Sequence, residues 1–516
     1  MRKLNMALYA IQNLYVDTVN ENKLVEDAIV GLLEKLDPHS NYLNPEEVKE
    51  MNEPLQGNFD GIGIQFNMLT DTLYVIQVIS GGPSEKVGIR AGDRIIEVDD
   101  TLIAGVKMKT NDVMRKLKGP KGTTVRVKVQ RSGVPGLIEF KIVRDKIPVY
   151  SMDAYYMLNN KTGYIRLNRF AATSHEEFIK AFKDLKSKGM ENLIFDLQNN
   201  GGGYLNAAID IADEFLKQRE TIVYTEGEHQ RREDAQATTK GSFENGKLIL
   251  LVDEYSASAS EIVAGAVQDW DRAVIVGRRS FGKGLVQRPI PLPDGSMIRL
   301  TTARYYTPTG RSIQKPYENG NLESYNKDLI ERYNHGEMVS ADSIHFPDSL
   351  KYNTLINKRT VYGGGGIMPD YFVPLDTTYN TAVWREIYAN GFIYRYAMNL
   401  VDKNREKYKK EYKNFNDFKS RFTVTDNMLE EVFNMMIDDR KTSEPDAKDT
   451  GTSEKDRKEF NISKSVIALQ IKGLIARDLW DMNEYVQIAN QQNESLKKAL
   501  EIIENQTEYD KLLTGK

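Results

Sequence analysis

The 516-residue sequence contains no cysteine. Disulfide bonds, thiolate zinc sites and cysteine nucleophiles are therefore excluded. It also has no run of 18 consecutive apolar residues, so no segment is predicted to cross a membrane as a helix. The formal net charge is only −4, which gives no general attraction to nucleic acid or to anionic membranes. The composition is that of a soluble globular protein, and the length predicts several domains.

The most informative stretch of the chain runs from Lys247 to Gln287. An unbroken apolar run at 248–252 predicts a buried strand, and apolar residues at helical spacing follow from Ile262 onward. Three serines lie between them: Ser256, Ser258 and Ser260. At such a junction side chains point out of the sheet and the helix N–H groups converge. Serines there are also common helix caps, so the pattern alone leaves both roles open.

A lysine between two glycines, Lys283, follows the next predicted strand at 272–277. A serine nucleophile needs a base, and a lysine can serve when burial lowers its pKa from about 10.4 to roughly 7–8. Taken alone, Lys283 would be an ordinary surface charge. Together with the serine cluster it predicts a hydrolytic site.

The glycines around Lys283 also approach the phosphate-binding loop pattern. That loop ends in Ser or Thr, whose hydroxyl holds magnesium, and it opens a helix. Here the last position is Gly284, and the prolines at 289, 291 and 293 exclude a helix. Nucleotide binding is therefore not predicted.

The segments SASASEIVAGAVQD and GRRSFGKGLVQ resemble the signatures of the carboxyl-terminal processing proteases, the tail-specific serine peptidases of family S41. The resemblance covers residues 10–375. It implies that Ser258 is the nucleophile, that Lys283 is the base and that Gln287 orients the lysine. It also implies a multidomain α+β fold, with a crotonase/ClpP-like α/β serine-protease core, an inserted PDZ domain and helical N- and C-terminal regions. No cofactor and no metal are implied.

A glycine loop, 198–203, lies between a predicted strand at 193–197 and an amphipathic helix that begins at Leu205. Such a loop lets backbone N–H groups approach a developing negative charge, although glycine loops also open helices without any ligand. The family pattern here is D-L-R-x-N-P-G-G, which supplies an oxyanion-hole amide. This sequence has Gln198 for the arginine and Gly201 for the proline. The expected donors are Gly203, with Gly202 as the alternative, and Ala259, the residue after the nucleophile.

Residues 57–145 change character, because short β-rich runs alternate with turn glycines. GGPSEKVGIRAGDRIIEVDD resembles a PDZ domain, and GIGIQF resembles its carboxylate-binding loop. Backbone N–H groups of such a loop can hold a terminal carboxylate while the peptide adds as a strand; the alternative is a simple glycine turn. The residues expected to bind the peptide terminus are Gly61, Ile62, Gly63, Ile64, Val113 and Leu117.

Four regions are predicted: a helical region at 1–56, the PDZ domain at 57–145, the peptidase core at 146–375 and a second helical region at 376–516. In the family the first region, with the DPHS-x-Y-L stretch at 37–43, often helps to form dimers. The sequence leaves open whether its apolar stripes pack internally or on a second subunit. His39 is predicted to be structural. Asp269, at the end of the nucleophile helix, is a supporting candidate, although a carboxylate there is usually a surface charge.

The sequence therefore predicts a serine endopeptidase that cleaves proteins near their C-termini after the PDZ domain has recognised the tail. The expected partners are protein or peptide substrates with free C-termini and no nucleic acid; a homo-oligomer and an activator or adaptor protein are compatible with it. The family implies the bacterial cell envelope or periplasm, although the first residues lack the apolar core of a signal segment. The alternatives are a PDZ scaffold with a silent dyad and a latent peptidase. A Ser-His-Asp triad is not favoured, because the five histidines lie outside these motifs and G-x-S-x-G is absent.

Overall fold

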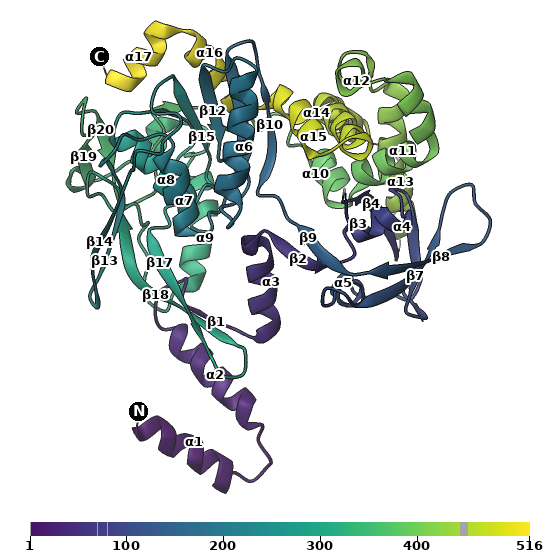
Figure 1. Ribbon diagram of the computed structural model, residues 1–516, viewed down its shortest axis with the longest axis horizontal. Helices are drawn as coiled ribbons and strands as arrows, with labels where there is room; N and C mark the ends of the chain where they lie inside the picture. The colour runs from purple at the N-terminus through teal and green to yellow at the C-terminus, as the bar shows by residue number, and fades with distance from the viewer. Residues whose placement is uncertain (1, 70, 80, 444–452, 516) are drawn as a thin grey trace.

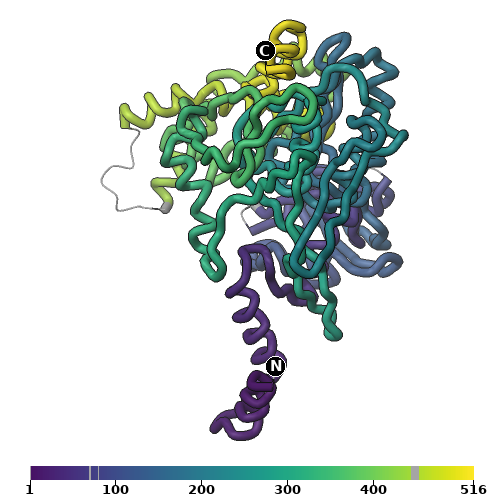
Figure 2. The backbone as a smooth tube through the Cα atoms, turned by 90° about the vertical axis from the view of Figure 1, so that its left-hand side faces the viewer, coloured from purple at the N-terminus to yellow at the C-terminus, as the bar shows by residue number. Residues whose placement is uncertain are grey.

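The computed structural model describes residues 2–69, 71–79, 81–443 and 453–515 (Figure 1). A large α/β body carries a small β domain and a helical bundle on one side, and the first two helices extend away from it (Figures 1 and 2). These helices are α1 (Arg2–Leu14) and α2 (Glu21–Leu33). No helix among the described residues is both long enough and apolar enough to span a membrane.

The body is built on a central sheet of six strands. In spatial order the strands are β10 (Met152–Met157), β11 (Thr162–Leu167), β12 (Asn192–Asp196), β15 (Leu248–Val252), β16 (Val274–Gly277) and β21 (Tyr371–Phe372). Strand β10 is antiparallel to β11, and all the other pairs are parallel. Every residue of β15 is buried, as the unbroken apolar run predicts for a strand covered on both faces.

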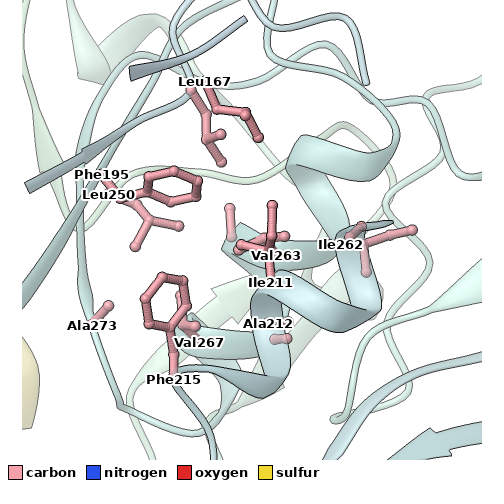
Figure 3. Close-up of a cluster of buried hydrophobic side chains, with 14 of the residues drawn as sticks. Leu167, Phe195, Ile211, Ala212, Phe215, Leu250, Ile262, Val263, Val267 and Ala273 are labelled. Atoms are coloured by element: carbon pink, nitrogen blue, oxygen red, sulfur yellow. The ribbon is translucent and has the colours of Figure 1, made fainter. Parts of the chain in front are cut away.

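Three helices cover one face of the central sheet: α6 (Ser174–Ser187), α7 (Leu205–Asp213) and α8 (Ala259–Asp269). Figure 3 shows Phe195 and Leu250 of the sheet packed against Ile211 and Val263 of α7 and α8. Helices α7 and α8 follow the loops after β12 and β15. Because the carboxyl ends of parallel strands meet at one edge of a sheet, the glycine loop and the serine cluster lie side by side.

The other face is covered from the far end of the chain, by α15 (Met482–Ala489), α16 (Glu494–Glu504) and α17 (Gln506–Thr514). Ile249 and Leu251 of β15 pack into one cluster with Leu496, Ile502 and Tyr509 of these helices. Alternate residues of β15 therefore serve the two faces. The sequence predicted helices in this region but not what they pack against. In the structure they form the layer that covers the second face of the central sheet.

A second, outer sheet contains β17 (Leu285–Pro291), β18 (Met297–Tyr306), β13 (Thr221–Gly227), β14 (Gln230–Gln236) and β1 (Asn41–Leu43). Strand β1 comes from the N-terminal region and pairs antiparallel with β18, with Asn41 opposite Arg299. Helix α3 (Pro45–Gln56) follows β1. The N-terminal segment is thus part of the same sheet as β17, the strand that follows Lys283.

The small β domain contains a sheet in the order β3-β4-β5-β7-β8, with β3 as its edge strand. Strand β2, before the domain, pairs with β9, after it, so the chain enters and leaves side by side. The elements are β2 (Asn58–Gly61), β3 (Ile64–Leu69), β4 (Thr72–Val78), α4 (Pro83–Val87), β5 (Arg94–Val98), β6 (Thr101–Leu102), α5 (Thr110–Leu117), β7 (Thr124–Gln130), β8 (Leu137–Val143) and β9 (Asp145–Pro148).

The helical bundle lies against the small β domain (Figure 1). Its helices are α10 (Ala382–Ala389), α11 (Phe392–Glu411), α12 (Phe415–Arg421), α13 (Asp426–Ser443) and α14 (Glu454–Leu479). Asp402 of α11 forms an ion pair with Arg94 of β5 at 3.5 Å. Asp481, directly after the bundle, accepts a hydrogen bond from Gln77 of β4 at 3.2 Å. The remaining elements, α9 (Leu322–Asn334), β19 (Lys351–Asn353) and β20 (Thr360–Tyr362), belong to the body.

Candidate active site

The structure separates the three serines of the cluster. Ser256 and Ser260 are fully buried. The Ser256 hydroxyl donates to the Leu197 carbonyl and the Ser260 hydroxyl donates to the Asn200 carbonyl, each at 2.8 Å. Both therefore fasten the serine turn to the neighbouring glycine loop. Only Ser258 lines the large cavity at this edge of the sheet.

Ser258 holds an unusual backbone conformation at the start of α8, with φ 55° and ψ −111°. Positive φ is uncommon for a residue with a side chain and costs roughly 1–3 kcal/mol, so surrounding contacts must maintain it. Its backbone N–H donates to the Glu261 carboxylate at 2.8 Å. The strain is thus held by the first turn of the same helix, and the Ser258 side chain reaches the cavity.

Glu261 joins the nucleophile turn to the lysine loop. It is fully buried. One carboxylate oxygen accepts from Ser258 N–H and from Lys283 N–H, at 2.8 and 2.9 Å, and the other accepts from the Ser280 hydroxyl and Gly282 N–H, at 2.6 and 2.7 Å. Burial raises the pKa of Glu261 to about 7, against the lowering effect of these hydrogen bonds.

The Lys283 side chain lines the same cavity as Ser258. Burial lowers its pKa to about 8, and the nearby positive charge of Arg299 contributes to the shift. Glu261 and Asp37 oppose it. A substantial fraction of Lys283 is consequently neutral near pH 8, which is what a general base requires.

Gln287 also lines the cavity, on strand β17. Its side-chain amide nitrogen donates to the Leu285 carbonyl at 3.0 Å and to the Thr301 hydroxyl at 3.4 Å. Among the described residues no hydrogen bond joins the Lys283 ammonium to Ser258 or to Gln287. Catalytic hydrogen bonds are often long without substrate; the three residues share one cavity.

The glycine loop distinguishes the two candidate oxyanion donors. The Gly202 N–H already donates to the Asn200 side chain at 2.9 Å. Within the part of the chain that the structure describes, the N–H groups of Gly203 and Ala259 have no acceptor. A Cβ on Gly202 would lie 2.8 Å from the Cβ of Ser258, so the loop touches the serine turn directly. Of the three expected donors, Gly202 is therefore engaged, while Gly203 and Ala259 keep an N–H group without an acceptor among the described residues.

The cavity has a volume of about 990 Å³, a size typical of a ligand site. Its apolar wall is formed by side chains from α3, α7, α8 and β17 and by Ala172, and charged or titratable side chains also line it. The apolar residues include Leu55, Ala172, Ala207, Ile262 and Leu285, and the charged or titratable ones include His175, Asp210, Arg288 and Arg299. An extended apolar peptide segment fits such a surface better than a highly charged ligand.

The six residues expected to bind a peptide terminus lie in the small β domain, apart from this cavity. Gly61, Ile62 and Gly63 are buried where the chain enters the domain, and half-buried Ile64 begins the edge strand β3. Val113 and Leu117 on α5 are only 0% and 3% exposed and belong to the domain core. Of these six residues, only Ile64 at the sheet edge presents appreciable surface.

Two residues that hold the site together were not found from the sequence, Glu261 and Tyr305. The Tyr305 hydroxyl contacts the backbone carbonyls of Ser258, at 3.1 Å, and Lys283. Glu261 stands inside the recognised segment SASASEIVAGAVQD, and Tyr305 stands on β18. The available signal for Glu261 was its position in that signature, but a buried glutamate and a tyrosine are not themselves typical of a serine–lysine site.

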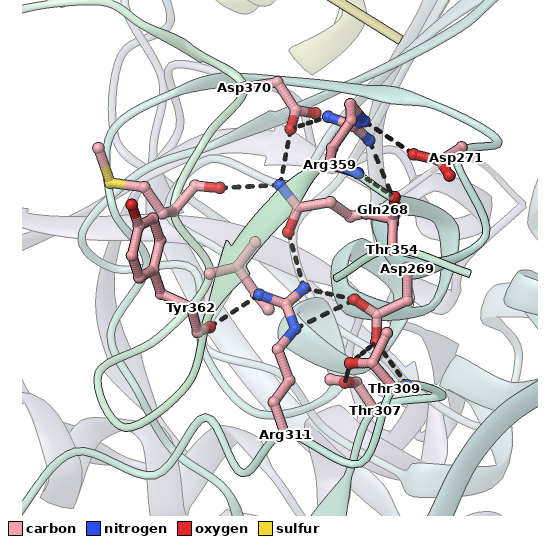
Figure 4. A network of polar contacts seen from close by, with 12 residues as sticks. Gln268, Asp269, Asp271, Thr307, Thr309, Arg311, Thr354, Arg359, Tyr362 and Asp370 are labelled. Carbon is pink, nitrogen blue, oxygen red and sulfur yellow. Dashed lines mark hydrogen bonds and ion pairs between the residues drawn. The ribbon is translucent and has the colours of Figure 1, made fainter. Parts of the chain in front are cut away.

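Neither His39 nor Asp269 lines the cavity. His39 contacts the Tyr325 hydroxyl at 2.9 Å, and burial lowers its pKa to about 3, so it is a neutral packed side chain. Figure 4 shows Asp269 at the far end of α8, bonded to Arg311 at 2.8 Å and to Thr309. Asp269 is fully buried and does not line the cavity. The alternative of an exposed surface charge is therefore wrong, and the network anchors the helix instead.

Residues 161–320 match peptidase family S41, residues 61–142 match a PDZ domain, and residues 1–47 match the activating protease CtpB N-terminal domain. Residues 383–481 match a family of unknown function. The carboxy-terminal-processing protease of Bartonella bacilliformis is 40% identical over 312 residues, which are 59% of this chain and 70% of that protein. The chain belongs to peptidase family S41.

Other relatives of this S41 peptidase include carboxy-terminal processing protease CtpB of Bacillus subtilis, 33% identical over 61% of this chain and 66% of its own length. A solved structure of the photosystem II D1 C-terminal processing protease is 30% identical, with 60% of this chain and 89% of that chain covered and a TM-score of 0.34. The predicted family, the serine protease activity, and the multidomain α+β fold with a PDZ domain and a helical C-terminal region are confirmed. The small β domain is the PDZ domain.

Proposed function

We propose that this S41 peptidase is an endopeptidase that cleaves proteins near their C-termini, with Ser258 as nucleophile and Lys283 as base. One observation carries the proposal. Ser258, Lys283 and the two N–H groups of Gly203 and Ala259 meet at one cavity, where burial lowers the pKa of the lysine to about 8.

The reaction follows from these positions. The hydroxyl oxygen of Ser258 attacks the scissile carbonyl carbon while neutral Lys283 takes the hydroxyl proton. The N–H groups of Gly203 and Ala259 stabilise the oxyanion; one donor of this kind contributes about 3–4 kcal/mol. Lys283 then protonates the leaving amine, the C–N bond breaks, and water, deprotonated by Lys283, releases the acyl group. Gln287 holds the lysine in place.

Recognition of the tail belongs to the PDZ domain in this proposal. Residues 61–64 hold the terminal carboxylate, the peptide adds to the open edge of β3, and α5, which carries Val113 and Leu117, forms the other wall of its groove. We propose the limits of 57–145 for this domain and 146–375 for the peptidase core, with the helices of 482–514 completing that core. Helix α3 connects the two, since Leu55 lines the cavity while Glu53 pairs with Lys118 beside α5.

The N-terminal helices support a homo-oligomer. Leu4, Met6, Tyr9 and Leu14 are exposed, and α1 has no buried residue. A second copy of the chain would cover these exposed apolar side chains; sedimentation would show a dimer that deletion of 2–16 abolishes. The family supports a location in the bacterial cell envelope, and an activator or adaptor protein remains compatible with it.

The decisive experiment compares the wild type with Ser258→Ala on an unfolded protein that ends in an apolar tail. We expect the wild type to shorten the substrate and Ser258→Ala to lose at least roughly 10⁴-fold in rate. Ser256→Ala and Ser260→Ala are matched controls, since their hydroxyls are bonded to loop carbonyls away from the cavity. Tail binding without cleavage by either protein would favour the PDZ scaffold or a latent enzyme.

Activity is expected to rise with pH. Lys283, with a pKa of about 8, must be neutral, and Glu261, with a pKa of about 7, must be ionised to hold both loops. Protonation inactivates both groups. The logarithm of kcat/KM should therefore rise with a slope near one between pH 7 and 8, and more steeply below pH 7. A profile that is flat from pH 6 to 9 would contradict the assignment of the base.

A further inference from the structure

The DPHS segment of the N-terminal region is hydrogen-bonded to strand β18, which pairs with the strand that carries Gln287. Its first residue, Asp37, accepts hydrogen bonds from the Thr301 hydroxyl at 2.8 Å and from the Ser40 hydroxyl at 2.5 Å. Ser40 in turn accepts from the Thr301 N–H at 3.0 Å. Strand β1 continues from this turn along β18. Two segments distant in sequence are thus joined at Thr301.

Thr301 connects Asp37 to the third residue of the proposed site. Gln287 lies opposite Thr301 in the β17–β18 pair. The Gln287 amide nitrogen donates to the Thr301 hydroxyl and to the Leu285 carbonyl. Both amide hydrogens are therefore committed, and among the described residues the amide oxygen has no donor.

The negative charge of Asp37 fixes which groups donate and which accept in the hydrogen bonds that link Gln287, Thr301 and Asp37. Burial raises the pKa of Asp37, but hydrogen bonds from Ser40 and Thr301 and from the His39 N–H lower it more, so the net shift is downward. An ionised carboxylate can only accept, so the Thr301 hydroxyl must donate to it. The hydroxyl oxygen is then free only to accept, and Gln287 must present its nitrogen. Its oxygen is left for the Lys283 ammonium or amine hydrogens.

We propose that Asp37 is a positioning residue for the base: through Thr301 it fixes the Gln287 amide with its oxygen directed to Lys283. The inference rests on the proposed function of Lys283. A lysine held by an acceptor on one side keeps its lone pair directed at Ser258. The N-terminal segment thereby completes the active site rather than only preceding the PDZ domain.

The alternative is a purely structural role, in which Asp37 only stabilises the turn at 37–40. Its carboxylate also accepts hydrogen bonds from the His39 and Ser40 N–H groups. Replacing Thr301 separates the two roles, because Thr301→Val removes the connection and leaves Asp37 and its charge in place. Thr302→Val is the matched control on the same strand. The Thr302 hydroxyl is buried without a hydrogen-bond partner among the described residues.

The experiment measures kcat and KM against pH for Thr301→Val, Thr301→Ser, Thr302→Val, Asp37→Asn and the Asp37→Asn/Thr301→Val double variant, with thermal unfolding of each. We expect Thr301→Val to lower kcat about 10- to 100-fold at unchanged KM. Thr301→Ser, which keeps the hydroxyl, and Thr302→Val should resemble the wild type. The double variant should lose no more than either single variant, because both break one chain.

Asp37→Asn should also move the midpoint of the pH profile downward, since the carboxylate raises the pKa of Lys283. The midpoint reflects every charged or titratable group around that lysine, and only one of them changes. These groups are Asp37, His39, Glu261, Arg299 and Tyr305. A change in folding alone would lower the unfolding temperature and leave the midpoint where it is.

Three results would overturn the inference: full kcat in Thr301→Val, equal losses in Thr301→Val and Thr302→Val, or losses that multiply in the double variant. These differ from failure of the proposed function. In that case Lys283→Met would remain active, or the wild type would not cleave at all, whatever the Thr301 variants do.

Discussion

Replacement of Lys283 by methionine is expected to abolish cleavage and at the same time to stabilise the fold. Loss of the base should lower kcat/KM by roughly 10⁴- to 10⁶-fold, as for other serine peptidases without their base. Burial lowers the lysine pKa from 10.5 to about 8. The folded state therefore disfavours the charged form, and this shift corresponds to about 3 kcal/mol.

The size of the stability effect depends on pH, and its sign does not change. Below about pH 8 lysine is charged in both states, so the full cost is present in the wild type and absent in Lys283→Met. Between pH 8 and 10.5 the folded lysine is neutral while the unfolded one is still charged, so folding must release a proton. The cost of that release falls as pH rises and vanishes near pH 10.5, where the unfolded lysine is also losing its proton. Urea unfolding at pH 7 and pH 10.5 should show a large and then a vanishing difference in the free energy of unfolding.

Lys472→Met is the control for this variant. Burial also lowers the pKa of Lys472, but it lies on α14 in the helical bundle and not at the cavity. Its variant should keep wild-type kcat/KM. An active Lys283→Met protein would refute the base, and an inactive one that is less stable than the wild type at pH 7 would refute the account of its pKa.

Replacement of Glu261 by glutamine is expected to damage both stability and rate. Glutamine turns one accepting oxygen into an NH₂ group, so two buried donors lose their acceptor: either Ser258 and Lys283 N–H, or Ser280 hydroxyl and Gly282 N–H. Each loss costs about 1–3 kcal/mol. The turn of Ser258 and the loop of Lys283 then shift relative to each other, and a displacement near 1 Å costs roughly 100-fold in kcat.

Asp269→Asn provides the comparison. Asp269 is equally buried on the same helix, and its substitution breaks a buried ion pair with Arg311. It should lose several kcal/mol of stability yet keep wild-type kcat per folded molecule, measured by titrating the reactive serine. If Glu261→Gln also keeps its kcat per folded molecule, the carboxylate is only a stabilising group and the proposed link between the two loops is wrong.

The place of the candidate site in the fold could be predicted from the sequence, because local rules determine the strand and the helix that flank it. The apolar run at 248–252 required a strand with both faces covered, and the spacing from Ile262 required a helix, so Ser258 had to stand at their junction. The choice among three serines needed the family resemblance. In the structure the hydroxyls of Ser256 and Ser260 donate hydrogen bonds to backbone carbonyls at the glycine loop, and Ser258 is the one of the three that lines the cavity.

Long-range partners could not be predicted in the same way. An amphipathic stripe shows that a helix has a buried side but not what covers it, so the packing of α16 on Ile249 and Leu251 has no local signal. The bond between Asp37 and Thr301 joins residues 264 positions apart, and spacing rules do not extend over that distance. Gln198 is a similar case, because its side chain accepts from Asn493 at 2.8 Å.

Because α16 and α17 cover one face of the central sheet, that face can be covered only late in the synthesis of the protein. Strand β15 leaves the ribosome early, but Leu496, Ile502 and Tyr509, which cover one of its faces, are translated about 250 residues later. At 5–20 residues per second this is a delay of roughly ten to fifty seconds. During that time one apolar face of the sheet lacks the side chains that cover it in the folded protein. The core of the body can therefore be completed only after residue 509 has been made.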